Sequence, residues 1–263
     1  MKKFAVIGDP INHSLSPQLL TEVFRQLRIK ANYQKHLIPT ESLSSFMLSN
    51  GLDGFNVTLP HKEKIIDHLT SLDSSAAAIG AVNCVFRNVG YNTDWIGFLR
   101  ALKIKQLDLR GRSCLLLGAG GAARSVAHAL ITTGSLSISV LNRSKERGNR
   151  LLSWIKKRMP TNAPSDTVEV VINCTPVGMW PDTKRLPMEN SLIHGATILI
   201  DTIYNPIETE WLKRGRKRGA TTLGGLEMLI AQGLASTDIW FGDNISEKVD
   251  IKKIRQRMES ALC

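Results

Sequence analysis

The fold class is decided by one stretch of the chain, Cys114-Leu115-Leu116-Leu117-Gly118-Ala119-Gly120-Gly121-Ala122-Ala123. An apolar strand-like run leads into the pattern G-x-G-x-x-A, and a helix-like segment follows it. In such a turn the first glycine permits the tight bend, the second lets the backbone approach a pyrophosphate, and N–H groups at the helix start face the phosphates. A glycine turn kept only for packing is the alternative. The stretch predicts a dinucleotide-binding unit with the cofactor at Gly118, Ala119, Gly120, Gly121 and Ala122.

The strand after this turn indicates which dinucleotide binds. An NAD-binding unit usually ends that strand, about 20 residues on, with a carboxylate that binds the ribose 2′-hydroxyl. Here the strand ends in Leu141-Asn142-Arg143-Ser144, and Lys145 and Arg147 follow. Arginine suits a phosphate because its donors form a planar fork. We therefore expect NADP(H), bound near Asn142, Arg143, Ser144, Lys145 and Arg147, with a solvated basic turn as the alternative.

Strand-like and helix-like segments alternate along the rest of the chain. We expect strands at 3–7, 33–38, 55–58, 81–86, 114–117, 137–141, 168–173 and 196–200. We expect helices after Pro17, from Asp94, after Gly225, and at 41–48, 60–69, 122–130, 145–157 and 210–218. This alternation is typical of βα units and a mainly parallel sheet. It predicts an α/β fold in which an N-terminal α/β domain precedes a Rossmann-type, doubly wound dinucleotide-binding domain.

A length of 263 residues suits one large domain or two modest ones. We place one boundary in the helix after Asp94 and the other near Gly225, where the last helices return to the first domain. The first domain then comprises 1–100 and 225–263, and the NADP-binding domain comprises 101–224. The stretch 157–167 is short for a complete βα unit, which leaves the topology there open.

Composition excludes several classes of protein. Hydrophobic residues make up 43% and charged residues 22% of the chain, which is typical of a globular protein. The apolar runs are too short for a membrane span, the start has no signal-peptide core, and the four cysteines show no CxxC spacing. We expect reduced thiols, a cytoplasmic protein, no metal and no membrane partner.

The net charge of +11 attracts anions, and part of it lies in two basic runs, 213–218 and 252–257. No aromatic residues interleave with these charges, which favours solvated helix faces over a nucleic-acid patch. A small anionic substrate is the expected partner. The sequence leaves the oligomeric state unknown.

Three polar motifs precede the glycine turn. Ser14-Leu15-Ser16-Pro17 places two hydroxyls on one side of an extended segment, where they suit a carboxylate, although Ser16 also reads as a helix N-cap. Lys62 follows Asn56-Val57-Thr58-Leu59-Pro60-His61 in the first turn of an expected helix, where a cation opposes the helix dipole and so suggests another role. Asp94 ends Tyr91-Asn92-Thr93-Asp94 and is either a functional carboxylate or an N-cap.

Together these segments resemble the shikimate dehydrogenase family. The resemblance rests on the motifs above, on Gly80-Ala81-Val82-Asn83, on Asn173-Cys174-Thr175-Pro176-Val177-Gly178-Met179, and on Gly225 through Gln232-Gly233, in the family's order. It implies a two-domain enzyme of aromatic amino-acid biosynthesis that reduces 3-dehydroshikimate reversibly with NADPH. Its substrate domain would be 1–100 with 225–263.

The resemblance also implies roles for single residues. Lys62 would transfer the proton and Asp94 would be its partner, while Ser14 and Ser16 would bind the substrate carboxylate. Contacts to ring hydroxyls or the reacting oxygen are implied for Thr58, Asn83, Asp94, Tyr204 and Gln232. Cofactor contacts on the nicotinamide side are implied for Thr175, Thr202 and Gly225, in a region that includes Gly178 and Met179.

Other interpretations stay open at this point. Asn83, Tyr204 and Gln232 each suit an ordinary structural role, and Met179 and Trp180 suit a core plug. A quinate/shikimate dehydrogenase with relaxed substrate or cofactor use and a non-catalytic NADP-binding regulator are alternative functions.

Overall fold

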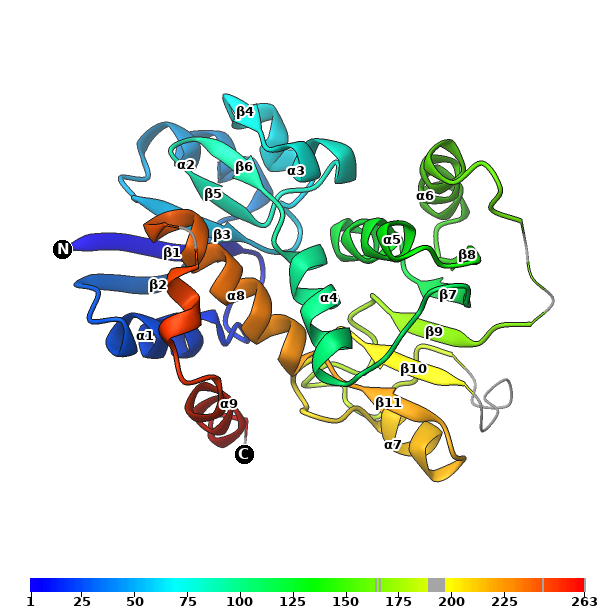
Figure 1. The fold of residues 1–263 in the computed structure, drawn as a ribbon. Helices are drawn as coiled ribbons and strands as arrows, with labels where there is room; N and C mark the ends of the chain where they lie inside the picture. The colour runs from blue at the N-terminus through cyan, green and yellow to red at the C-terminus, as the bar shows by residue number, and fades with distance from the viewer. Residues whose placement is uncertain (164, 166, 189–196, 243, 263) are drawn as a thin grey trace. The chain divides into compact units, whose positions relative to one another are not determined.

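The computed structural model describes residues 1–163, 165, 167–188, 197–242 and 244–262 (Figure 1). Two compact units divide the chain: Met1–Gly97 with Ile230–Ala261, and Phe98–Leu229. Helices α4 (Asp94–Ile104) and α8 (Leu226–Phe241) each contain one of these divisions. Each unit has its own sheet, which confirms the α/β class. The expected strand start at Ala196 and the cysteine Cys263 lie outside the described residues.

The first unit, called unit 1 below, contains a sheet of order β2-β1-β3-β5-β6-β4 within the described residues. β1 pairs in parallel with β2 and β3, whereas β5 pairs antiparallel with β3 and β6. The hairpin between β5 and β6 was not predicted. Its turn residues Arg87 and Asn88 both have positive φ. Two-residue turns of this kind usually have the sequence Asn-Gly or Asp-Gly, which is absent here. The strands are β1 (Lys2–Gly8), β2 (Ala31–Leu37), β3 (Gly54–Val57), β4 (Ser71–Leu72), β5 (Cys84–Phe86) and β6 (Val89–Tyr91).

Helix α1 lies between the sheet of unit 1 and the C-terminal helix α9. It packs on β1 and β2 and against α9. Its Glu22 is buried and pairs with Arg25 at 2.7 Å and with Arg257 of α9 at 3.6 Å, and the hydrogen bond from Arg25 lowers the pKa of Glu22 to about 2. Most charged side chains of the run 252–257 are exposed, as a solvated helix face requires. The helices wholly within unit 1 are α1 (Ser16–Gln26), η1 (Thr40–Ser42), α2 (Leu43–Ser49), η2 (Lys64–His68), α3 (Ser74–Ile79), η4 (Ile245–Lys248) and α9 (Ile251–Ser260).

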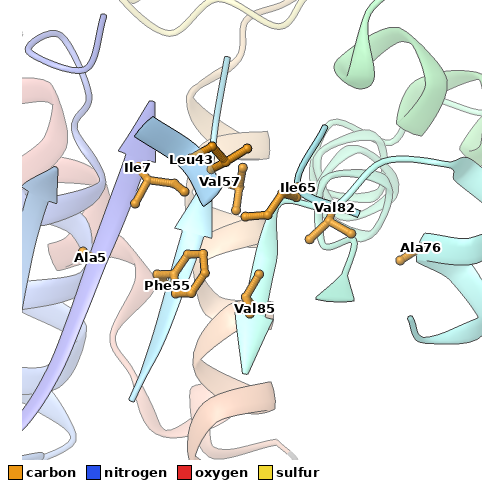
Figure 2. Packing of buried hydrophobic residues seen from close by; sticks show 9 residues of the cluster. All are labelled: Ala5, Ile7, Leu43, Phe55, Val57, Ile65, Ala76, Val82 and Val85. Carbon is orange, nitrogen blue, oxygen red and sulfur yellow. The ribbon is translucent and has the colours of Figure 1, made fainter. Parts of the chain in front are cut away.

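One apolar cluster of unit 1 lies on a single face of β3. Phe55 and Val57 point into it, and Asn56 between them must point to the opposite face because side chains alternate along a strand (Figure 2). The cluster consists of Ala5, Ile7, Leu43, Phe55, Val57, Ile65, Ala76, Val82 and Val85. Across the described ranges, every helix is too short or too polar to cross a lipid bilayer.

The second unit, called unit 2 below, has a parallel sheet of order β11-β10-β9-β7-β8 in its described residues. The chain leaves β7 for β8 on one side and returns as β9 on the other, so the strand order reverses between β7 and β9. Ligands of open α/β sheets bind at the carboxyl ends of strands at such a reversal. The strands are β7 (Ser113–Leu117), β8 (Ser137–Leu141), β9 (Val170–Asn173), β10 (Ile198–Asp201) and β11 (Thr221–Leu223), and the helices are α5 (Gly121–Thr133), α6 (Lys145–Arg158) and α7 (Glu210–Lys217).

The stretch 157–167, whose topology was open, contains no strand among its described residues. It links α6 to β9, and one of its side chains pairs with β8 instead. Asn162 accepts a hydrogen bond from Ile138 N at 2.7 Å and donates one to Ile138 O at 3.0 Å. The side-chain amide of Asn162 therefore satisfies the backbone N–H and C=O of Ile138. These groups lie on the outer edge of β8, where a further strand could otherwise pair.

A buried carboxylate holds the carboxyl edge of this sheet together. Asp201, at the end of β10, accepts hydrogen bonds from Asn173 Nδ2 at 3.1 Å, Ile203 N at 3.0 Å and Thr209 Oγ1 at 2.9 Å. These donors are all neutral. Burial raises the pKa of Asp201 from 3.8 to about 7, and the three hydrogen bonds oppose that rise. The loops after β9 and β10 and the start of α7 are thus tied to one ionisable group.

Replacing Asp201 with asparagine should remove a pH-dependent loss of stability. With a raised folded pKa, the stabilising contribution of Asp201 is complete below about pH 4 and is lost as the pH rises to about 7. The introduced asparagine keeps a side-chain oxygen that accepts from Asn173 and Ile203. The Thr209 hydroxyl can rotate so that its oxygen accepts from the new amide N–H. Between pH 5 and 8 the unfolding free energy from urea titration should fall on the order of 3 kcal/mol further in the wild type than in Asp201→Asn.

The matched control is Asp67→Asn, which changes an exposed carboxylate and should leave the pH profile unchanged. Parallel profiles for wild type and Asp201→Asn would contradict the raised pKa.

Candidate active site

A lysine and a carboxylate from distant parts of the sequence form an ion pair in unit 1. Lys62 lies in the turns after β3, and Asp94 is the first residue of α4. Lys62 Nζ donates to Asp94 Oδ2 at 2.5 Å. The two side chains are 16% and 7% exposed, so solvent screens the pair only partly. The structure therefore brings together the two residues assigned to proton transfer.

The expected helix over 60–69 is wrong for its first half. Residues 60–63 form turns, and only the 3₁₀ helix η2 follows. Two buried contacts hold these turns: His61 Nε2 lies 2.6 Å from Ile38 O, and Lys62 O accepts from Val82 N at 2.7 Å. Lys62 thus faces no helix dipole of its own segment, and the dipole argument for its function fails. Its position is instead decided by tertiary hydrogen bonds.

The carboxylate of Asp94 is directed at side chains and not at its own helix start. Its second oxygen, Oδ1, accepts from Asn83 Nδ2 at 2.8 Å, while Asp94 N donates to Asn92 Oδ1 at 3.1 Å. Asn92, and not Asp94, therefore supplies a side-chain acceptor to an N–H at the start of α4. Both Asp94 oxygens remain available to Lys62 and Asn83, so the N-cap interpretation of Asp94 is wrong.

Asn83 connects this pair to two other elements. It lies just before β5, is almost fully buried, and accepts from Thr93 N at 2.6 Å through Oδ1. Its Nδ2 group also lies 3.4 Å from Gln232 Oε1 of α8. One ammonium, one carboxylate and two amides therefore converge, a set that can bind hydroxyl groups and move a proton.

The two serines lie at the start of α1, and Ser14, not Ser16, accepts a hydrogen bond from a backbone N–H there. Ser16 is the first helical residue, Leu15 occupies the N-cap position, and Ser16 N donates to Ser14 Oγ at 3.3 Å. The prediction that Ser16 caps the helix is therefore wrong, because Ser14 serves that N–H. Both serines are more than nine-tenths buried. The nearby Lys35 donates to Asn12 O at 2.6 Å, which places a cation beside the same loop.

Thr58 follows β3, and its backbone N donates to Ile7 O at 2.9 Å. Its methyl carbon lies 2.5 Å from the position that a Cβ on Gly8 would occupy. A side chain at position 8 would displace Thr58, so glycine there keeps the threonine in place.

The glycine turn of unit 2 has the geometry that a dinucleotide needs. Gly118 has φ +109°, and a Cβ there would lie 3.2 Å from Cys174 O and 3.1 Å from Thr175 Cγ2. At Gly120, where α5 begins, a Cβ would have Arg147 Nη2 at 3.8 Å as its nearest neighbour. The space over Gly120 is therefore open, with a guanidinium beside it. This space, with the N–H groups of the first turn of α5, fits a pyrophosphate.

The basic turn after β8 is also ordered. Ser144 caps α6 by accepting from Arg147 N at 3.4 Å, and Asn142 Nδ2 donates to Ser144 O at 2.8 Å. Arg143 and Lys145 are exposed. The acidic residue nearby, Glu146, pairs with Arg150 at 3.5 Å.

The residues expected on the nicotinamide side lie on or beside the loops that Asp201 holds. Thr175 donates through Oγ1 to Asn173 Oδ1 at 2.7 Å, and Thr202 donates through Oγ1 to Asn173 O at 3.0 Å. Gly225 N donates to Ile203 O at 2.9 Å, and a Cβ at Gly225 would lie only 2.3 Å from Thr202 O. Tyr204 is half-buried on the same loop as Thr202.

Trp180 is 57% exposed, so the core-plug interpretation of this residue is wrong. Of the cysteines in the described part of the chain, Cys84 and Cys114 are buried and Cys174 is half-buried, and no disulfide joins any two of them. Within the same residues, no group of three or more His, Cys, Asp or Glu side chains is arranged to hold a metal ion.

Some residues of these sites were missed from the sequence. Asn173 and Asp201 anchor the loops after β9 and β10, and a polar residue at the end of an apolar strand was the available signal. Tyr33 and Ser236 contact the same buried amide, that of Asn56, but neither has a local pattern that separates it from core residues.

Both units match known protein families. Residues 6–85 match the profile of the shikimate dehydrogenase substrate binding domain, and residues 100–175 match that of shikimate / quinate 5-dehydrogenase. A shikimate dehydrogenase (NADP(+)) of Shouchella clausii is 37% identical over 273 residues, which cover 98% of this chain and 99% of the relative.

Solved structures agree with these matches. A shikimate dehydrogenase in complex with NADP+ has a TM-score of 0.90 and 31% identity, over 100% of this chain and 96% of the other. The enzyme of Thermus thermophilus, in complex with NADP(H) and shikimate, has a TM-score of 0.85 and 31% identity, over 98% and 100% of the two chains. With identity above 30% along nearly its whole length, the chain belongs to the shikimate dehydrogenase family.

Proposed function

We propose that this protein catalyses the reversible, NADPH-dependent reduction of 3-dehydroshikimate to shikimate, with Lys62 as the proton-transfer residue. Family membership makes the chain an NADP-dependent oxidoreductase. The observation that carries the proposed mechanism is the 2.5 Å ion pair between Lys62 and Asp94. We also propose that the enzyme acts in the cytoplasm and uses neither nucleic acid nor membrane as a partner.

The ion pair supports a proton donor at the reacting oxygen. When bound, NADPH supplies the hydride that the ketone carbon accepts, and negative charge develops on the ketone oxygen. The Lys62 ammonium within hydrogen-bond reach would protonate that oxygen, and neutral Lys62 would take the proton back in the reverse direction. Asp94 holds the ammonium in place and is itself held by Asn83.

The remaining polar groups of unit 1 support a substrate with a carboxylate and ring hydroxyls. Ser14 and Ser16 lie at the start of α1, where the helix dipole and the Lys35 ammonium both favour an anion. Hydroxyl groups of the substrate would be bound by Thr58, Asn83, Asp94 and Gln232 of unit 1, and the resemblance adds Tyr204 of unit 2.

The cofactor is proposed to bind at the carboxyl edge of the sheet in unit 2. The open space over Gly120 accommodates the pyrophosphate, and the cations Arg143, Lys145 and Arg147 near the end of β8 favour a 2′-phosphate. Thr175, Thr202 and Gly225 would contact the nicotinamide side. On this proposal 1–100 with 225–263 bind the substrate and 101–224 bind NADP(H), in keeping with the profile match of residues 6–85.

The first test measures turnover directly. Purified protein with 3-dehydroshikimate should consume NADPH faster than NADH at equal concentration, because the basic turn favours the 2′-phosphate. Oxidation of shikimate and of quinate with NADP+ measures the reverse reaction. Equal turnover of quinate would make the protein a quinate/shikimate dehydrogenase, and NADPH binding without any turnover would make it a non-catalytic regulator.

Replacing Lys62 with alanine should lower kcat by a factor on the order of 10²–10⁴, because the ketone oxygen loses its proton donor. NADPH binding, followed by cofactor fluorescence, should stay near normal because Lys62 lies in unit 1. Lys64→Ala is the matched control, since Lys64 is exposed two residues away. An unchanged kcat in Lys62→Ala would remove Lys62 from the mechanism.

Replacing Arg143 with alanine should raise the KM for NADPH by about 10- to 100-fold, the expected loss for a hydrogen-bonded charge, and change the KM for NADH little. Arg150→Ala is the control, because Arg150 is exposed on α6 and pairs with Glu146. Equal losses with both cofactors would refute the contact between Arg143 and the 2′-phosphate.

A further inference from the structure

We propose that Tyr33, Asn56 and Ser236 are positioning residues that couple the carboxylate-binding serines to the Lys62–Asp94 pair through one buried hydrogen-bond network. None of the three is among the residues assigned above to substrate or cofactor. The inference rests on the proposed function, because it concerns how the substrate-binding groups of unit 1 are held.

Asn56 is the centre of the network, and its amide can take only one orientation. Its Oδ1 accepts from Tyr33 Oη at 2.8 Å, while Nδ2 donates to Asn83 O at 3.0 Å and to Ser236 Oγ at 2.9 Å. Reversing the amide would place its oxygen 3.0 Å from the carbonyl oxygen of Asn83 with no proton between them. The buried amide is therefore the second donor to Asn83 O, beside Val57 N at 2.9 Å, and the side chain of Asn83 holds Asp94.

Ser236 carries the network from α8 to the start of α4. Its hydroxyl donates to Gln232 O at 3.0 Å, so its oxygen accepts from Asn56 Nδ2 and from Thr93 Oγ1 at 3.3 Å. Thr93 Oγ1 in turn accepts from Asn83 Nδ2 at 3.0 Å. Thr93 Oγ1 also lies 3.2 Å from Asn83 Oδ1, so the Thr93 hydroxyl links the side-chain amide of Asn83 to Ser236.

Tyr33 carries the network to the serines. Its ring packs beside Phe24 and Trp240, with centroids 6.4 and 6.2 Å away, and its hydroxyl reaches Asn56. Burial raises the pKa of Tyr33, and a hydrogen bond with Ser16 opposes that rise. The phenol therefore stays protonated, so that it donates to Asn56 Oδ1 and its oxygen is left to accept from Ser16.

Burial makes the network sensitive to the loss of any member. Tyr33, Asn56, Asn83, Thr93 and Ser236 are each at most 5% exposed. Water cannot readily replace a missing partner, and an unpaired buried polar group costs about 1–3 kcal/mol. Removing the phenol oxygen leaves Asn56 Oδ1 without its donor, and the amide that donates to Asn83 O loses one of its constraints.

The test is Tyr33→Phe, which keeps the ring contacts and removes one oxygen. We expect the KM for shikimate to rise by about 3- to 10-fold, the loss typical of one buried hydrogen bond, while the KM for NADP+ stays unchanged. Tyr91→Phe, in the same unit, is the matched control and should change neither. A shikimate KM within twofold of wild type would overturn the proposal.

A double-mutant cycle separates coupling from independent damage. Tyr33→Phe and Ser236→Ala act on the same amide, so the combined variant should raise the shikimate KM by less than the product of the two single effects. A purely multiplicative result would show that the two residues act independently and would contradict the network.

A readout without substrate distinguishes failure of this proposal from failure of the proposed function. In NMR spectra, the side-chain amide signals of Asn56 and Asn83 should both shift in Tyr33→Phe and stay in place in Tyr91→Phe. Wild-type protein that does not turn over shikimate would refute the function alone. An unshifted Asn83 signal in Tyr33→Phe would refute the network whether or not the enzyme is active.

Discussion

The side-chain amide of Asn83 is the constraint on which the candidate catalytic pair depends. It donates to Asp94 and accepts from Thr93 N, so it holds both the carboxylate and the backbone at the start of α4. Lys62 reaches the other oxygen of Asp94 from turns that are fixed by the backbone bond between Lys62 and Val82. Because both side chains of the ion pair are already held in place, little side-chain entropy is lost when the pair forms. A proton-transfer group that is positioned in advance lowers the entropic cost of the reaction.

Unit 2 uses the same chemistry with a different electrostatic outcome. Asn173 donates to Asp201 as Asn83 donates to Asp94, and in both places the amide joins segments at the ends of strands. Asp94 has an ammonium partner, whereas the three hydrogen-bond donors of Asp201 are neutral and burial raises its pKa to about 7. Asp94 therefore acts as the ion-pair partner of Lys62, whereas Asp201 holds the loops after β9 and β10 in place.

Much of the fold could be predicted because its signals are local. The apolar run 114–117, the glycine turn and the helix after it are consecutive in the sequence, and their geometry follows from backbone sterics. The hairpin turn at Arg87 and Asn88 was missed because it has no residue pattern that outweighs the alternatives. The expected helix over 60–69 was wrong because the buried His61 and the backbone bond of Lys62 to Val82 hold its first residues in turns.

The sequence by itself determined the α/β class, the place of the dinucleotide turn, the order of the motifs and the resemblance to one family, because each depends on residues that are close along the chain. Tertiary structure alone decided that Asp94 points at Lys62 and that the Asn56 amide joins Tyr33, Asn83 and Ser236. These outcomes depend on hydrogen bonds between residues up to 180 positions apart, as from Asn56 to Ser236. A buried donor forms its hydrogen bond with an acceptor that packing brings close to it. No local sequence pattern specifies which residue supplies that acceptor.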